Sequence, residues 1–282
     1  MLRCRRGYAE TWWAGLVSGS LCIGAMLICP WSRAILGQEL PSLTGITHDA
    51  LSQETHLYHL AEQISVQVMA GEPTRQTIGS ATVVQRQGSV YWVLTNAHVL
   101  RADPGPYWVQ TSDGRVYPAQ PVENLAFNGH DLAVLAFASP QTEYRVVNLN
   151  SGVQVGERVY AAGFPIPFNA DEAPKFTVRR GQISFLLPKP LAGGYQLGYT
   201  SSVESGMSGG PVLNAQGQLV AINGMHSESL WGDPYVFMDG TLPDVSLKVE
   251  LSHYSWGIPM STVQSLLPAR VSWSRDEEAV IR

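Results

Sequence analysis

Cysteine is scarce in this sequence, and its placement limits where disulfide bonds or metal sites could form. The chain has 282 residues and three cysteines, Cys4, Cys22 and Cys29, which all lie within the first 30 residues. The rest of the chain therefore has neither a disulfide framework nor a cysteine-based zinc site. This absence does not exclude an oxidising compartment, but it shows that the body of the protein does not depend on disulfides.

Charged residues are also few, at 15 % of the chain, and the body has no basic cluster. Residues 1–34 carry a net charge of +3, so the chain's total of −5 leaves −8 on the remainder. Proteins that bind nucleic acids need Lys and Arg to neutralise phosphates, so we expect no nucleic-acid partner. Hydrophobic residues make up 45 % of the chain, which excludes a disordered protein and favours a compact one.

A long uncharged run with an apolar centre, residues 11–32, lies near the N-terminus. It follows a basic start that contains Arg3, Arg5 and Arg6. This order is typical of a secretory signal, and Ser32 and Ala34 are small residues that suit cleavage before Ile35. The alternative is an uncleaved anchor, because ~20 residues just span a bilayer. We therefore expect an exported protein, periplasmic or secreted, that contacts the membrane only if residues 11–32 are retained.

The remaining chain divides into segments by composition. Residues 35–56 are polar with little periodicity and are predicted to be a linker, and residues 271–282 form a charged tail. Between them lie short apolar runs separated by Gly, Asn, Asp and Pro, which predict β-strands. Examples are Ile64–Met69, Ser80–Val84, Tyr91–Leu94, Leu132–Phe137, Arg158–Ala162, Gln182–Leu187 and Leu219–Ile222. A short closing helix is predicted over Ser261–Leu267, with Ser261 as its cap.

The glycine-rich segment Gly206-Met207-Ser208-Gly209-Gly210-Pro211 is the first candidate for chemistry. A nucleophilic serine needs an exposed hydroxyl group on a turn free of bulky side chains, with backbone N–H groups directed at the developing oxyanion. The amides of Gly206 and Ser208 are the candidate donors. Such a turn could also be purely structural. It fits the nucleophile elbow of α/β-hydrolases too, but that fold needs an Asp and then a His after the serine within a series of alternating strands and helices, and the 74 residues after Ser208 lack this alternation.

Two further segments supply a candidate base and its partner. His98, in Thr95-Asn96-Ala97-His98-Val99, follows an apolar run, and an unperturbed imidazole titrates near pH 6.5, which suits proton transfer. The alternative is a hydrogen-bonded core histidine. Asp131 opens an apolar run, where a carboxylate is costly to bury unless it is paired, for example with an imidazole. It could instead be a turn or cap residue. The neighbouring His130 lacks an evident orienting partner.

The chain order His98, Asp131, Ser208 is that of the chymotrypsin arrangement. The segments around these residues resemble the three catalytic blocks of trypsin-like serine peptidases, and they are most similar to bacterial branches such as the Deg/HtrA proteases and the glutamyl endopeptidases. The resemblance covers roughly residues 60–268. It implies an all-β fold of two antiparallel six-stranded barrels with a short C-terminal helix, and a serine endopeptidase that acts on proteins or peptides through an acyl-enzyme.

On this resemblance, residues 57–150 form the barrel with His98 and Asp131, and residues 151–270 form the barrel with Ser208. It implies no cofactor and no metal. Two other functions stay open: an inactive protease-like binding module, and a quality-control chaperone-protease of the envelope. The retained His, Asp and Ser disfavour the binding module.

The sequence also departs from the family pattern. Met207 occupies a position where Asn or Asp is usual, and the connection between Ser227 and Tyr254 is long. That connection holds three aspartates, Asp233, Asp239 and Asp244, which match no calcium-loop spacing. By the resemblance, Ser202 lies at the base of the specificity pocket and His226 on its wall. A neutral Ser202 argues against cleavage after Arg or Lys, and His226 suggests cleavage after Glu or Asp, although a small apolar preference is the alternative.

Overall fold

A computed structural model of the chain describes residues 48–72, 74–169, 171–226 and 234–267. The predicted signal or anchor segment, the three cysteines, the first part of the predicted linker and the charged tail lie outside these residues. In the part of the chain that is described, no helix is long and apolar enough to cross a membrane.

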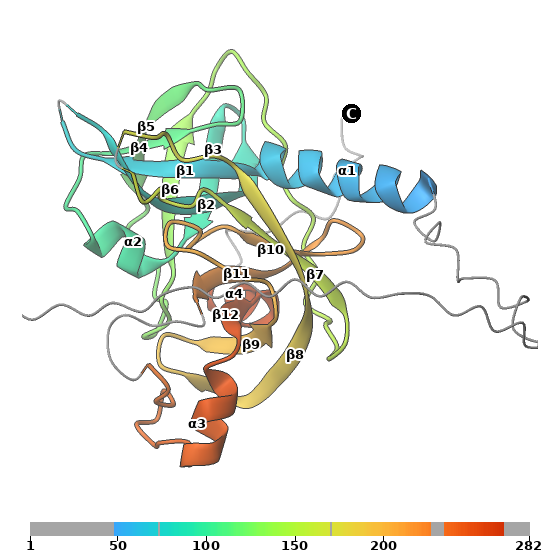
Figure 1. The fold of residues 1–282 in the computed structure, drawn as a ribbon. Coiled ribbons are helices and arrows are strands. Elements are labelled where there is room, and N and C mark those ends of the chain that lie inside the picture. The colour runs from blue at the N-terminus through green and yellow to red at the C-terminus, as the bar shows by residue number, and fades with distance from the viewer. Residues whose placement is uncertain (1–47, 73, 170, 227–233, 268–282) are drawn as a thin grey trace, which may run out of the picture. The chain divides into compact units, whose positions relative to one another are not determined.

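Six antiparallel strands close the first barrel in the order β1-β2-β3-β6-β5-β4 (Figure 1). They are β1 (Ser65–Ala70), β2 (Gln76–Gln87), β3 (Val90–Thr95), β4 (Tyr107–Gln110), β5 (Val116–Pro121) and β6 (Ala133–Ala138). Successive side chains of a strand point to opposite faces. On β2, Ala81 and Val83 therefore join the core of this barrel, whereas Ser80 and Thr82 hydrogen-bond to the second barrel.

The second barrel closes in the order β10-β11-β12-β9-β8-β7. Its strands are β7 (Arg158–Gly163), β8 (Thr177–Leu191), β9 (Tyr195–Tyr199), β10 (Pro211–Asn214), β11 (Leu219–Met225) and β12 (Ser255–Pro259). Val159, Leu197 and Val212 belong to the apolar cluster that fills this barrel. Two closed antiparallel barrels of six strands confirm the predicted fold class.

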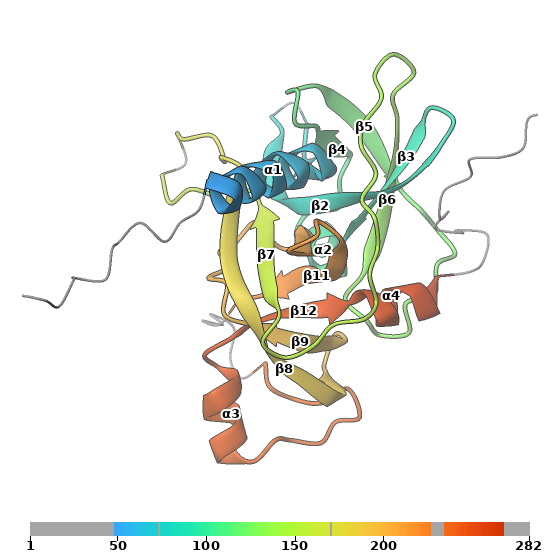
Figure 2. The ribbon, with the colours of Figure 1, turned by 90° about the vertical axis from the view of Figure 1, so that its right-hand side faces the viewer.

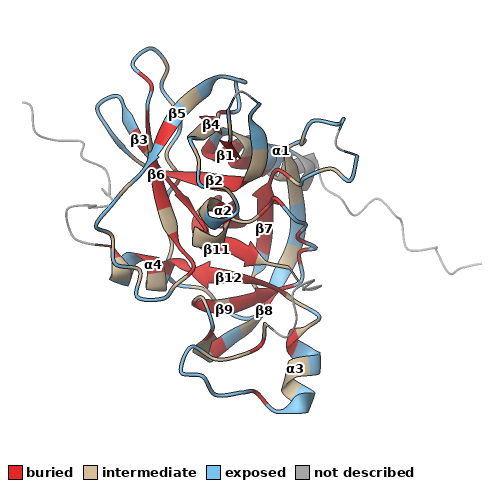
Figure 3. Cartoon of the chain, turned by 90° about the vertical axis from the view of Figure 1, so that its left-hand side faces the viewer, coloured by how far each residue is buried: buried red, intermediate tan, exposed pale blue. Residues whose placement is uncertain are grey.

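A third apolar cluster joins the two barrels. It combines Leu94 of the first barrel with Leu213 of the second, and it includes Ile64 from helix α1 (His48–Ile64) and Met260 from helix α4 (Met260–Leu266). Figure 3 shows that burial is concentrated in the strands, while helix α3 (Val245–Leu251) is largely exposed. The barrels therefore share a continuous core, which places the loops between them in a fixed relation.

Helix α1 is the main difference from the sequence-based prediction. It begins at His48, inside the segment predicted to be a linker, so residues 48–56 are helical. The helix is held by one apolar face, because Leu57, Leu60, Ala61 and Ile64 are all buried at the spacing of a helix. These residues lie in its second half, and the polar first half carries no such periodic signal. The predicted boundary between the linker and the first barrel, at Leu57, therefore falls inside helix α1.

The closing helix was predicted in the right place but with the wrong cap. Helix α4 begins at Met260, and its N-cap is Pro259, which makes no side-chain cap hydrogen bond. Ser261 lies inside the first turn instead. Met260 and Val263 are buried, so the packing of α4 against the shared core, and not a serine cap, sets where the helix starts.

Candidate active site

The register of two strands brings the predicted base and its partner together. Strand β3 pairs with β6 so that Thr95 lies opposite Ala133. His98 comes three residues after Thr95, in the short helix α2 (Ala97–Arg101), and Asp131 comes two residues before Ala133. Both residues therefore leave the first barrel at the same edge. Helix α2 contacts strand β2 of the first barrel, and Figures 2 and 3 view the molecule from its two opposite sides.

His98 and Asp131 make two hydrogen bonds. The ring Nδ1 of His98 lies 2.5 Å from Asp131 Oδ2, and the backbone N–H of His98 donates to Asp131 Oδ1 at 2.8 Å. Asn96, which is fully buried, donates from Nδ2 to the Asp131 carbonyl oxygen at 2.8 Å. With Nδ1 occupied by the carboxylate, Nε2 is the nitrogen of His98 that is free to exchange a proton with a substrate or a nucleophile.

The carboxylate of Asp131 has two further donors. The hydroxyl group of Tyr195, in β9 of the second barrel, donates to Oδ2 at 2.5 Å, and Arg101 Nη2 lies 3.3 Å from Oδ1. Burial raises the pKa of Asp131, but the hydrogen bond and charge of His98, followed by the Tyr195 hydroxyl, outweigh it and hold the pKa below its ordinary value. Asp131 is therefore ionised throughout the neutral range.

Ser208 lies on the turn between β9 and β10, as the glycine pattern predicts. Gly206 has φ +93°, a conformation that favours glycine, and a Cβ there would lie 2.6 Å from the Phe164 carbonyl oxygen. Among the described residues, neither the Gly206 amide nor the Ser208 amide donates to a protein acceptor. Both N–H groups are therefore available to a ligand oxygen, as an oxyanion site requires.

The first barrel holds this turn through the outward face of β2. The Ser80 hydroxyl donates to the Gly206 carbonyl at 2.7 Å and accepts from the Phe164 amide at 2.9 Å. The Ser80 backbone N–H donates to the Ser208 carbonyl at 2.9 Å, and Thr82 Oγ1 donates to the Gly209 carbonyl at 3.1 Å. These bonds hold the carbonyl groups of Gly206, Ser208 and Gly209 toward the first barrel.

The second barrel holds the same turn through packing and one amide. The Met207 side chain is fully buried in the apolar cluster of this barrel. Its carbonyl oxygen accepts from Nδ2 of Asn223 at 2.8 Å, and Asn223 Oδ1 in turn accepts from the Tyr199 hydroxyl. The departure at Met207 therefore replaces a polar side chain by an apolar anchor, while the backbone of the turn keeps its support.

The candidate nucleophile, Ser208, and the candidate base, His98, are not hydrogen-bonded to each other in this structure. Ser208 Oγ donates to the Gly224 carbonyl at 3.1 Å, and among the described residues no hydrogen bond joins Oγ to the His98 ring. Catalytic hydrogen bonds are often long or absent without substrate and form only in the complex. A rotation of the Ser208 side chain would release Oγ from Gly224.

The other predicted site residues have less direct support. Ser202 is exposed, and His226 is half-buried at the end of β11. Within the described ranges, no hydrogen bond or ion pair connects these two side chains, so their place in a specificity pocket stays a prediction. His130 Nδ1 contacts the Phe127 carbonyl oxygen at 2.8 Å, whereas it is His98 that contacts Asp131.

Sequence reasoning missed the residues that support the site. Ser80 and Asn223 had a readable signal, because each is a polar residue inside an otherwise apolar run, and a buried polar group needs a partner. Tyr195 had no such signal. It lies 64 positions from Asp131, and only the closure of the second barrel brings it there.

The aspartates of the long connection have structural partners. Asp239 forms an ion pair with Lys189 at 2.6 Å, and Asp244 caps α3 by accepting from the Leu247 amide at 2.8 Å. Asp233 lies outside the described residues. In the described part of the chain, no group of three or more His, Cys, Asp or Glu side chains is arranged to hold a metal ion.

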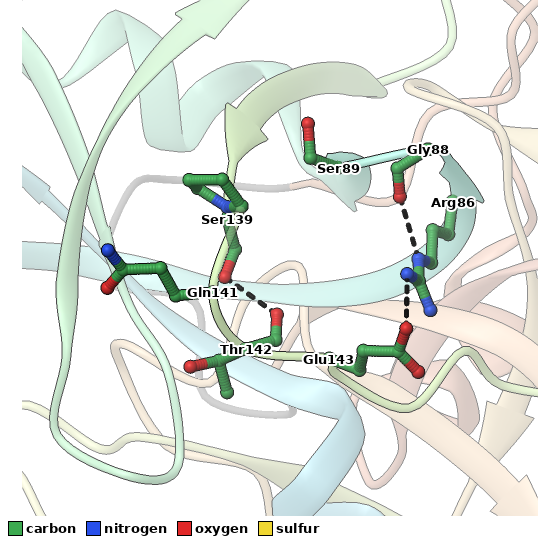
Figure 4. A pocket seen from close by; sticks show the side chains of 8 residues that line it. Arg86, Gly88, Ser89, Ser139, Gln141, Thr142 and Glu143 are labelled. Atoms are coloured by element: carbon green, nitrogen blue, oxygen red, sulfur yellow. Dashed lines mark hydrogen bonds and ion pairs between the residues drawn. The ribbon is translucent and has the colours of Figure 1, made fainter.

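The first barrel also carries a separate pocket, whose lining side chains are drawn in Figure 4. It is lined by residues of the β2–β3 hairpin and of the segment after β6. Val90 pairs with Ala138 at that end of the β3–β6 pair, opposite to the end that carries His98 and Asp131. Its cation, Arg86, contacts Glu143 at 2.6 Å and the Gly88 carbonyl at 2.8 Å. The charged group of this pocket is therefore bound by other residues of its own lining, and we assign the pocket no role.

Comparison with known proteins agrees with this geometry. The model of the trypsin-like peptidase domain family matches residues 79–222, which is more than half of the chain. Similar curated proteins include the serine protease HTRA2, mitochondrial, of Drosophila grimshawi, Drosophila virilis and Drosophila ananassae. Each is 29 % identical over 163 residues, which cover 55 % of this chain and 36 % of the relative. The chain thus spans about a third of the length of these relatives.

Proposed function

Because the chain belongs to the trypsin-like peptidase family, we propose that it is a serine endopeptidase with His98, Asp131 and Ser208 as its catalytic triad. The family is the one that the sequence resembles, while the particular similarity to its bacterial branches stays a prediction. The observation that carries the proposal is the convergence of a His98–Asp131 pair from one barrel with a glycine-rich turn from the other. The amides of Gly206 and Ser208 in this turn donate to no acceptor in the described part of the chain.

The proposed reaction follows from the atoms that are free. Ser208 Oγ attacks the carbonyl carbon of the peptide bond as its proton passes to Nε2 of His98, and the amides of Gly206 and Ser208 bind the oxyanion. His98 then returns the proton to the leaving amine as the C–N bond breaks. A water molecule repeats the sequence on the acyl-enzyme and frees the acid. Asp131, ionised and buried, stabilises the imidazolium that forms in each half.

Fluorophosphonate labelling tests the proposal without a known substrate. We expect stoichiometric labelling of Ser208 in the folded protein, and complete loss of labelling and peptide hydrolysis in Ser208→Ala and His98→Ala. Ser151→Ala is the matched control, because Ser151 is an exposed serine outside the site. A folded protein that is not labelled would contradict the proposal and favour an inactive protease-like binding module.

Substrate preference is proposed at a coarser level, as proteins or peptides. The predicted preference for Glu or Asp depends on His226, and profiling a peptide library with the wild type and with His226→Ala tests it. No enrichment of acidic residues before the cleaved bond would contradict that preference. Export is likewise proposed from the N-terminal sequence pattern alone, and sequencing the N-terminus of the mature protein would reveal cleavage before Ile35.

A further inference from the structure

One oxygen of the Asp131 carboxylate receives two short hydrogen bonds from different barrels. His98 Nδ1 lies 2.5 Å from Oδ2, and the Tyr195 hydroxyl donates to the same oxygen at 2.5 Å. Tyr195 is 7 % exposed, and the Asp131 side chain is 10 % exposed. A hydrogen bond to a charged group is strengthened where water is excluded, so this contact is a strong one.

Tyr195 remains a donor over the whole range in which a peptidase of this type works. Burial, followed by the negative charge of Asp131, raises the pKa of Tyr195 well above its ordinary value of 10.0. Its hydroxyl group thus stays protonated, and with an ionised acceptor the proton points toward Asp131. The polarity of this hydrogen bond is therefore set by the chemistry of the two groups.

The other charged or titratable groups near this carboxylate act differently. Arg101 is 3.3 Å from Oδ1, but its side chain is 68 % exposed, so solvent screens its charge. His130 directs Nδ1 to the Phe127 carbonyl, away from the carboxylate. Tyr199 is buried, and its hydroxyl group donates to Asn223. Among the described residues, the side-chain donors to the Asp131 carboxylate are thus His98, Arg101 and Tyr195, and of these Tyr195 is the buried one.

The second barrel is shaped to admit Tyr195 at this position. Gly224 faces it, and a Cβ on Gly224 would lie 2.5 Å from the Tyr195 ring and 2.6 Å from its hydroxyl oxygen. The turn before Tyr195 adds a backbone contact, because the Asp131 amide donates to the Gly193 carbonyl at 2.8 Å. The β8–β9 turn and Tyr195 therefore hold both the main chain and the side chain of Asp131.

We propose that Tyr195 is a positioning residue of the active site, which fixes the Asp131 carboxylate from the second barrel and thereby sets the geometry of the Asp131–His98 hydrogen bond. This inference rests on the proposed function. It makes the catalytic histidine and aspartate, which both come from the first barrel, dependent on correct docking of the second barrel.

The test is the pH dependence of fluorophosphonate labelling in Tyr195→Phe, which keeps the ring and removes only the hydroxyl group. A carboxylate that loses a donor leaves more negative charge for His98, so the imidazolium persists to higher pH. We expect the acidic limb of the labelling rate to move to higher pH by about half a unit, and the rate at neutral pH to fall about tenfold.

Tyr91→Phe is the matched control. Tyr91 is a fully buried tyrosine of the first barrel whose hydroxyl group accepts from the Tyr144 amide at 3.0 Å, away from the triad. This variant should lose stability but keep the wild-type pH profile. If Tyr195→Phe folds and its profile coincides with that of the wild type, the inference is wrong, whereas a wild type that is not labelled refutes the proposed function instead.

A second measurement covers the case in which Tyr195→Phe does not fold. Site-specific incorporation of 3-fluorotyrosine at position 195 keeps the phenol ring and its hydroxyl group. The added fluorine makes this hydroxyl group a stronger hydrogen-bond donor. The acidic limb should then move to lower pH, opposite to the effect of Tyr195→Phe. An unchanged limb in the fluorinated protein would overturn the inference.

Discussion

Asp131 and Ser208 belong to different barrels, and each is held by residues of the barrel it does not belong to. Asp131 is part of the first barrel, but its carboxylate accepts a hydrogen bond from the Tyr195 hydroxyl group of the second barrel. Its backbone amide also donates to the Gly193 carbonyl of the second barrel. The turn that carries Ser208 is part of the second barrel, but it is hydrogen-bonded to Ser80 of the first barrel. The exchange is reciprocal, so neither half of the site is supported by its own barrel alone.

The two supports differ in kind. Asp131 is held by donors to a buried charge, so its support acts on proton transfer and depends on pH. The Ser208 turn is held by neutral hydrogen bonds and by the buried Met207 side chain, so its support acts on the position of the oxyanion amides. Changes on the first side should therefore alter pH profiles, and changes on the second should lower rates without moving those profiles.

The largest effect is expected when the charge of Asp131 is removed. Asp131→Asn should lower kcat by about 10⁴-fold, because a neutral amide neither stabilises the imidazolium nor holds the correct tautomer. Steady-state kinetics on a peptide substrate at pH 7 measure this. Asp113→Asn is the control, since Asp113 bonds Thr111 and Tyr144 away from the triad. A loss of kcat below tenfold in Asp131→Asn would contradict the view that the charge of Asp131 is what its support preserves.

The next effect is on the oxyanion turn. Gly206→Ala should lower kcat by about 10²- to 10³-fold, because the new Cβ meets the Phe164 carbonyl at 2.6 Å and displaces an oxyanion donor. Gly156→Ala is the control that separates backbone strain from displacement of the oxyanion donor. Gly156 has φ +89°, but nothing lies within 4 Å of a Cβ built there. That control should lose ~1–2 kcal/mol of stability and keep full kcat. Equal losses of kcat in both variants would contradict this account.

Ser80→Ala should have a smaller effect and sharpens the contrast with Tyr195. It leaves the Gly206 carbonyl and the Phe164 amide without their buried partner, so we expect ~1–3 kcal/mol lower stability and about tenfold lower kcat. The pH profile should not move. Ser139→Ala is matched, because Ser139 is also buried but donates to Thr142 outside the site. A shifted acidic limb in Ser80→Ala would erase the distinction between the two supports.

The smallest effect is expected at an ion pair that serves neither support. Lys189 and then the Thr241 hydroxyl and amide lower the pKa of Asp239 to about 2. This depressed pKa stabilises the fold above the ordinary value of 3.8, and the contribution disappears as pH falls through about 2. Because both side chains are partly exposed, Lys189→Met should change Tm by less than about 2 °C at pH 7 and leave kcat unchanged. An NMR titration should show the pKa of Asp239 rising toward its ordinary value, and a loss of activity would contradict this assignment.

The parts of this site that sequence reasoning reached are local. His98, Asp131 and Ser208 each lie beside a strand or a glycine-rich turn whose chemistry is visible within ten residues. Ser80 was within reach, as a polar residue in an apolar run, but its partner was not. Helix α1 was missed because its periodicity is confined to its buried half, and the cap of α4 because tertiary packing outweighed a favourable cap residue.

By itself, the sequence determined seven of the twelve strands that the structure describes, the order of the three catalytic candidates and the glycine turn, since alternation, spacing and backbone freedom are properties of neighbouring residues. Only the tertiary structure decided which groups hold them. Tyr195 reaches Asp131 across 64 positions and Ser80 reaches Gly206 across 126, because two barrels close and then share a core. The physical reason is that a hydrogen bond is specified by distance in space, and strand pairing sets that distance independently of separation along the chain.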